Sequence, residues 1–260
     1  RYILPSFGCR SPLRRPHSDK ISHKLELAAH EKPFLDMLWQ WQTYRREIYN
    51  MVKIFRTIDN NVHQINEAQE GSWIALIDPT ATEIVEIAEK YDIDVDHLRA
   101  PLDEEERSRI EVEDHYTLIL VDIPMIEERN DKEWYGTIPM GIVVTDDKIF
   151  TVCLEDTPVL SSFMDGRVRN FFTYKRTRFI LQILYRNASL YLHYLRIIDK
   201  KSDEVEQKLH KSQRNQELIE LLELQKSLVY FTTSLRSNEV VLEKLLKVEN
   251  IKQQIGRAHV

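Results

Sequence analysis

The sequence predicts an α/β protein: a mixed-sheet α/β/α layered domain followed by long antiparallel helices that form a coiled-coil-like hairpin. Two observations predict this class. Before residue 167, short β-prone runs alternate with short helical patterns, as in layered α/β domains. After it the pattern is helical, and no Gly or Pro occurs between Arg167 and Ile255, which permits unusually long helices. We therefore expect an α/β domain over residues 51–166 and a long-helix region over residues 167–254.

The first domain contains candidate strands and two candidate helices. The strands are expected at 51–57, 72–77, 116–124, 136–145 and 148–154, which are runs of apolar and β-branched residues. Thr80 and Glu83 have the spacing of a capping box, and the apolar stripe that follows predicts a helix directly behind Thr80. Residues 94–98 predict a second, short helix. Asp146 and Asp147 lie between two apolar runs and predict the turn of a hairpin.

The helical region carries a heptad repeat. Leucines recur every seven residues, and a second set follows three residues behind each of them: Leu221, Leu228, Leu235 and Leu242, then Leu224, Phe231, Asn238 and Leu245. This a/d pattern predicts an antiparallel helical hairpin or coiled-coil element, with Asn238 as its one polar d position. A seam of this kind is normally structural, so we assign it to packing.

Composition limits the function classes. The formal net charge of −6 argues against a nucleic-acid footprint, and no GxGxxG or P-loop pattern occurs. Cys9 and Cys153 cannot form a disulfide framework or a metal quartet, which favours a reducing cytoplasm. No run of eighteen or more apolar residues is present. No nucleophile–base arrangement stands out, so we expect a protein that is not an enzyme.

The two ends of the chain look foreign to the rest. Residues 1–50 begin without Met and contain prolines and a basic run, so we expect a non-native or disordered upstream extension, with Met51 as the initiator. The alternative is a genuine basic extension; it lacks the apolar core of a signal peptide. Residues 255–260 match one reading frame of a widely used sequencing adapter, and we expect them to be an artefact.

The most distinctive segment is residues 102–114, which pack seven carboxylates and two arginines into thirteen residues. One interpretation is a solvated, arginine-laced helix entry. The other is the handling of a hard cation, because Mg²⁺ and Ca²⁺ select carboxylate oxygens. His97 and His115 flank the segment, and a metal role for them is conceivable, although such histidines are more often surface or strand-end residues.

The order of this acidic turn, the Glu-Arg-x-Arg-x-Glu pattern of residues 106–111 and the strand that follows resembles the cytoplasmic N-terminal portion of CorA-type divalent-cation (magnesium) transporters. Residues 73–80 look like the strand-to-helix connection early in that domain. Residues 228–238 look like its later helical segment. The resemblance covers roughly Met51 to Lys247 and keeps the order of the family.

The resemblance implies a transporter or channel that moves Mg²⁺, or Co²⁺ or Ni²⁺, through a homopentameric pore in the cell (inner) membrane. The residues of this chain would lie on the cytoplasmic side. The C-terminal stalk and the transmembrane helices, with their Gly-Met-Asn signature, are absent from this chain, so we expect a fragment without the pore. No nucleic-acid partner is implied.

In this family divalent ions also bind the cytoplasmic domain between subunits and bias the pore towards the closed state. One family ligand position falls on Ala100, which cannot coordinate a metal. Asp103, Glu104 and Glu105 are the candidate replacement for a regulatory Mg²⁺ site. Two other interpretations stay open: a Zn²⁺-transporting relative of the same family, and a free-standing soluble α/β plus helical-hairpin interaction module.

Overall fold

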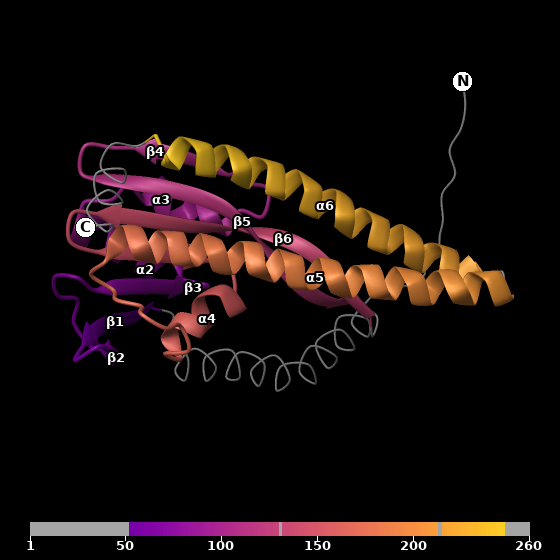
Figure 1. Cartoon of the computed structure of the whole chain (residues 1–260). Coiled ribbons are helices and arrows are strands. Elements are labelled where there is room, and N and C mark those ends of the chain that lie inside the picture. Colours follow the sequence, from indigo (N-terminus) through magenta and orange to yellow (C-terminus); the bar gives the residue numbers. More distant parts are fainter. Residues whose placement is uncertain (1–51, 130–131, 213–214, 248–260) are drawn as a thin grey trace, which may run out of the picture. The chain divides into compact units, whose positions relative to one another are not determined.

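The computed structural model describes residues 52–129, 132–212 and 215–247, which belong to one compact unit, Met51–Val260 (Figure 1). The expectations for residues 1–50 and 255–260 fall outside the described residues. Seven strands form a single sheet in the order β2-β1-β3-β7-β6-β5-β4. Their bounds are β1 Val52–Ile58, β2 Asn61–Ile65, β3 Trp73–Ile77, β4 Arg109–Val112, β5 Tyr116–Arg129, β6 Lys132–Thr145 and β7 Ile149–Cys153.

The sheet is mixed, as predicted. Strands β3 and β7 pair in parallel, and every other neighbouring pair is antiparallel. The sequence prediction missed β2 and β4, the two edge strands of the sheet. Edge strands are paired on one side only and carry many polar residues, so they lack the apolar run that identifies a buried strand. Strand β4 lies inside the acidic segment, which therefore forms a turn and a strand.

Helices cover both faces of the sheet, which confirms the predicted α/β/α layers. Their bounds are α2 Ala81–Tyr91, α3 Val95–Arg99, the 3₁₀ helix η1 Ala100–Leu102, α4 Pro158–Met164, α5 Arg176–Ser212 and α6 Asn215–Leu245. Helix α2 begins as predicted: the Thr80 hydroxyl accepts from the Glu83 N–H at 3.2 Å, and the Thr80 N–H donates to the Glu83 carboxylate at 2.7 Å. On this face Ile84, Ala88 and Leu98 are buried against the sheet.

The opposite face is covered by α4, α5 and α6 and has an aromatic core. Trp73 of β3 packs against Phe163, Phe171 and Phe179, with ring centroids 5.0 to 6.4 Å apart. Its indole N–H donates to the Thr151 hydroxyl at 2.9 Å, so the buried ring keeps no unpaired donor. The long helices thus share a core with the sheet, and residue 167 marks a change of secondary structure within one compact unit.

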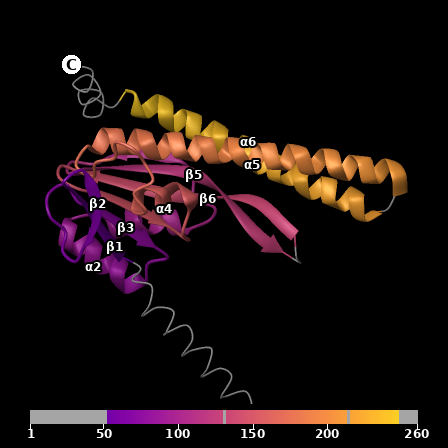
Figure 2. The ribbon, with the colours of Figure 1, turned by 60° about the horizontal axis from the view of Figure 1, so that its bottom comes forward.

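Helices α5 and α6 lie side by side and run beyond the strands (Figure 2). The extended ends of β5 and β6 accompany them, and Tyr135 of β6 is buried with Tyr191, Tyr194 and Phe231 of the helices. In the described ranges no helix combines the length and the apolar content needed to cross a bilayer.

The seam of α6 differs from the predicted a/d pattern. The d positions are buried as expected, but Leu228 and Leu242 at the a positions are each 39% exposed. The second buried row lies three residues after the d positions instead: Ser227, Ser234 and Val241. The reason is that α6 packs on strands β4, β5 and β6 as well as on α5, and small residues allow the helix to approach the sheet closely.

Asn238 joins α6 to the centre of β5. Its side chain accepts the N–H of Asp122 at 2.9 Å and donates to the carbonyl of Asp122 at 2.8 Å. The same carbonyl also accepts from Asn187 at 2.9 Å and from Tyr191 at 3.2 Å. The main-chain groups of Asp122 need side-chain partners because this residue lies beyond the end of the pairing between β5 and β4, whose last pair is Arg109 with Leu120. The polar d position therefore fixes the helix on the sheet.

Candidate functional site

The acidic segment begins with a tight turn behind η1. The N–H of Asp103 donates to the carbonyl of Ala100 at 3.2 Å, and the Asp103 carbonyl accepts from the Glu106 N–H at 3.0 Å. The Asp103 carboxylate accepts from the N–H of Glu105 at 3.0 Å. This local hydrogen bonding lets an aspartate stabilise a turn, and it uses one of the two Asp103 carboxylate oxygens.

The three predicted metal ligands lie on this turn and point to solvent. Asp103, Glu104 and Glu105 are all exposed. Of the ion pairs that the described residues form, none involves these three carboxylates. The turn also does not gather three ligand atoms around one point in the part of the chain that the structure describes. Their role as a Mg²⁺ site stays a prediction.

Glu104 adds its charge to an acidic patch that also includes Glu127, Glu155 and Asp156. Burial raises the pKa of Glu155, and the negative charges of Glu127, Asp156 and Glu104 raise this pKa further. These residues come from the η1–β4 turn, from β5 and from the loop after β7. The sequence reasoning missed the last three because they are distant in the chain and carry no local motif. A bound cation would relieve their mutual repulsion.

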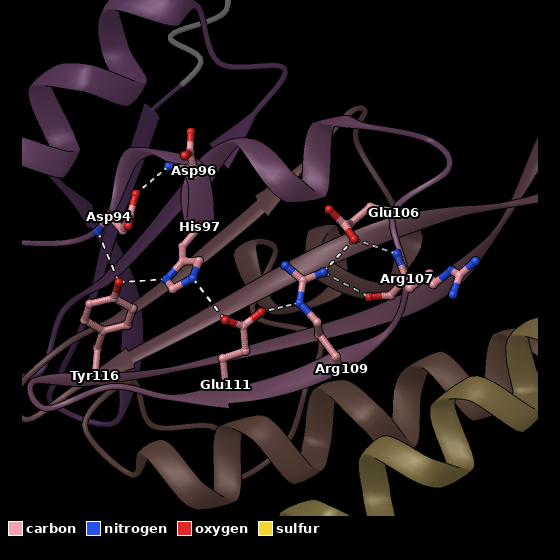
Figure 3. Close-up of polar contacts among 8 residues, drawn as sticks. All are labelled: Asp94, Asp96, His97, Glu106, Arg107, Arg109, Glu111 and Tyr116. Atoms are coloured by element: carbon pink, nitrogen blue, oxygen red, sulfur yellow. Dashed lines mark hydrogen bonds and ion pairs between the residues drawn. The ribbon is translucent and has the colours of Figure 1, made fainter.

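The second half of the acidic segment forms an ordered polar network along β4 (Figure 3). Arg109 lies between two carboxylates. Its Nη1 donates to Glu106 Oε1 at 2.6 Å, and its Nε donates to Glu111 Oε1. Glu106 Oε1 also accepts the N–H of Arg107 at 2.8 Å. Arg109 therefore neutralises charge on Glu106 and Glu111. It forms no ion pair with the turn at Asp103–Glu105, which keeps its negative charge.

His97 extends this network to α3. Its Nε2 lies 3.2 Å from Glu111 Oε2, and its Nδ1 lies 2.7 Å from the hydroxyl of Tyr116. The same hydroxyl accepts the N–H of Asp94 at 3.1 Å. Figure 3 shows the imidazole between the tyrosine and the glutamate, with Arg109 beyond Glu111. The sequence had placed His97 beside the acidic segment but could not give its partners, because they depend on how α3 packs beside β4.

Electrostatics keep this network charged. The hydrogen bond from Arg109 lowers the pKa of Glu111; burial opposes this, and the charge of Arg109 and the hydrogen bond from His97 add to the lowering. Glu111 is thus a carboxylate at neutral pH. Partial burial raises the pKa of Tyr116, so its hydroxyl keeps its proton. His115, the other flanking histidine, is exposed on the β4–β5 turn.

Comparison with known proteins gives one family. A model of the family described as CorA-like Mg²⁺ transporter protein matches residues 68–258. The Cobalt/magnesium transport protein CorA of Methanocaldococcus jannaschii is 27% identical over 179 residues, which is 65% of this chain and 53% of that relative. The chain therefore spans about half the length of this curated relative.

Solved structures share the fold. The complete CorA magnesium transporter from M. jannaschii matches 80% of this chain and 68% of its own, with a TM-score of 0.67 and 20% identity. Its soluble domain matches 80% and 86%, with a TM-score of 0.66 and 23% identity. The ZntB cytoplasmic domain from Vibrio parahaemolyticus matches 80% and 85%, with a TM-score of 0.57 and 12% identity. At these identities the likeness concerns the fold.

Proposed function

Since this chain belongs to the CorA-like family of Mg²⁺ transporter proteins, we propose that it is the cytoplasmic regulatory part of a membrane transporter that moves Mg²⁺, and also Co²⁺ or Ni²⁺. The family consists of transporters, not enzymes. The observation that carries the proposal is the family match over residues 68–258, which includes five of the seven strands, the helices on both faces of the sheet and both long helices. Under this proposal the pore would lie in a part of the transporter outside residues 68–258.

The test is transport by the full-length protein encoded at this locus. Expressed in cells that lack their own Mg²⁺ uptake systems, it should restore growth at low Mg²⁺ and take up Mg²⁺ in a flux assay. Uptake of Zn²⁺ without Mg²⁺ would replace the proposal by the Zn²⁺-transporting alternative, which the fold likeness to the ZntB domain keeps open. Absence of any divalent flux would favour the free-standing interaction module.

The regulatory role is proposed for Asp103, Glu104 and Glu105. The supporting observation is that Glu104 lies near enough to Glu155 to raise the pKa of Glu155, so the turn adds negative charge to an acidic patch. Mg²⁺ keeps several of its waters when it binds carboxylates at a protein surface, so we expect an affinity roughly in the millimolar range. The ion would bind in the closed state of the transporter and be lost when Mg²⁺ is scarce.

Neutralising the turn tests this role. In the full-length protein, the variant D103N/E104Q/E105Q should lose part of the Mg²⁺-dependent protection from proteolysis. A matched control is the variant E86Q/E89Q/E239Q, which removes three exposed carboxylates from α2 and α6 and should respond as the parent does. An unchanged Mg²⁺ response of the first variant would end the hypothesis.

We also propose that the full-length protein is a homopentamer. Its support within this chain is the outer side of α6, where Leu218, Leu222, Val229 and Val240 are between 49% and 60% exposed. Apolar side chains on the solvent face of a helix indicate a surface that another segment or subunit covers. Sedimentation of the full-length protein in detergent should give five copies. Residues 51–254 alone should be a monomer or a weak oligomer, and a tight pentamer of that fragment would contradict this.

A further inference from the structure

We infer that His97, Glu111 and Glu113 form a separate cation site that selects a transition-metal ion such as Zn²⁺ over Mg²⁺. The three residues come from α3, from β4 and from the turn after β4. Each offers one ligand atom, and the three atoms lie within 4.8 Å of one another. The site goes beyond the proposed transport function, because it lies within one chain and involves neither the pore nor the turn at 103–105.

The spacing suits a tetrahedral ion. His97 Nε2 and Glu111 Oε2 lie 3.2 Å apart. Zn²⁺ binds imidazole nitrogen and carboxylate oxygen at about 2.0–2.1 Å, and two such ligands in a tetrahedron are about 3.3 Å apart. Two of the three ligands are therefore already at the required separation. Glu113 is exposed and its side chain needs only a small movement to complete three protein ligands, with water in the fourth position.

A second layer of contacts holds both inner ligands in place. Tyr116 contacts His97 Nδ1 at 2.7 Å and is itself held by the main chain of Asp94. Arg109 binds Oε1 of Glu111 and leaves Oε2 directed at the imidazole. Metal-binding histidines typically have their other ring nitrogen hydrogen-bonded in this way, because the contact fixes the tautomer and the ring orientation.

The hydrogen bonds can serve both the empty and the loaded site. Without a metal, His97 Nε2–H donates to Glu111, and the Tyr116 hydroxyl donates to Nδ1. With a metal on Nε2, the ring adopts the other tautomer, and Nδ1–H donates to the oxygen of Tyr116. No protein contact has to be broken except the direct one between His97 and Glu111, which the ion replaces.

The ligand set selects the kind of metal. Imidazole suits Zn²⁺, Ni²⁺ and Co²⁺, whereas Mg²⁺ prefers oxygen ligands and octahedral geometry. Glu113 follows Glu111 by two residues of extended chain, so its carboxylate lies on the same side of the strand and adds a second oxygen ligand beside the imidazole. An open depression of about 360 Å³, lined by Asp94, Glu113 and Tyr116, lies beside the outer ligand of the site.

Metal titration of the full chain tests the site. Zn²⁺ binding, measured by competition with a chromophoric chelator, should be weakened strongly by His97→Ala and by Glu113→Gln. Glu113 is exposed, so its substitution should leave the fold intact. Tyr116→Phe removes a supporting contact and should weaken binding about 10- to 100-fold. His63→Ala, at an exposed histidine on β2, is the matched control and should bind Zn²⁺ as the parent does.

The other histidines of the chain are present in the parent and in every variant of the site, so the test compares the Zn²⁺ affinity of each variant with that of the parent. Binding of Zn²⁺ by the His97→Ala and Glu113→Gln variants with the affinity of the parent would overturn the inference. Displacement of Zn²⁺ by an equal concentration of Mg²⁺ would overturn it as well. The readout is binding to this chain and not transport, so a failure here is distinguishable from a failure of the proposed function.

Discussion

Replacing Asn238 by alanine should destabilise the protein although the residue touches no ligand. Asn238 lies on α6, is 7% exposed, and satisfies both main-chain groups of Asp122 on β5. After the replacement the Asp122 carbonyl keeps Asn187 and Tyr191 as donors. The Asp122 N–H loses the acceptor that Asn238 provides, and it is covered by α6 and cannot reach water freely.

The expected loss follows from that single donor. An unsatisfied buried polar group costs about 1–3 kcal/mol, because folding removes its water without replacing it. The amide of Asn238 also loses its own contacts and packing, which places the total at about 2–3 kcal/mol of unfolding free energy. This is a large fraction of the stability of an ordinary domain.

Urea denaturation of the full chain, followed by far-UV circular dichroism, measures the effect. The control is Gln225→Ala, an exposed position on the same helix, which should change the unfolding free energy by less than about 0.5 kcal/mol. If Asn238→Ala lowers the unfolding free energy no more than the control does, the polar d position does not fix α6 on the sheet.

Two further predictions concern stability. Burial raises the pKa of Asp122 above its ordinary value of 3.8, although the hydroxyls of Ser108 and Ser234 partly offset it. The folded protein therefore favours the protonated form of Asp122. The stability that this preference gives is fully present below the pKa that Asp122 has in the unfolded chain, and it is lost as pH rises through the higher pKa of the folded protein. Asp122→Asn should therefore gain stability relative to the parent between about pH 4 and pH 7, and a constant difference in denaturation midpoints would contradict this. Gly141→Ala should lower the unfolding free energy by about 1–3 kcal/mol in urea denaturation, because the added Cβ would lie 2.3 Å from the Pro101 ring. An unchanged denaturation midpoint would show that η1 moves aside at no cost.

Local signals predicted much of the fold. Trp73–Ile77 and Ile149–Cys153 are short apolar runs rich in aromatic and β-branched residues, which is typical of buried strands, and the capping box at Thr80 fixes the start of α2. The strand at Arg109–Val112 was hidden by its charges, because an edge strand needs no apolar run. The buried side of α6 could not be predicted from its leucines, since Ser227 and Ser234 face the sheet for reasons of space.

The site was only partly predictable. The density of carboxylates located the acidic segment, but its division into an exposed turn and a paired strand depends on the fold. Glu155 follows Glu104 by some fifty residues in the chain, and no motif links them. The contact between His97 and Glu111 likewise arises from the packing of α3 beside β4, which the sequence pattern of either element does not contain.

Ser108 connects the acidic turn to the long helix. It immediately precedes Arg109, and its hydroxyl donates at 3.3 Å to the same Asn238 oxygen that holds Asp122. Any sliding of α6 along the sheet must therefore break its bond to the sheet and its bond to the turn in one step. If a ligand at the acidic segment shifted Ser108, the position of α6 would change the affinity for that ligand by the same factor, because such coupling is reciprocal.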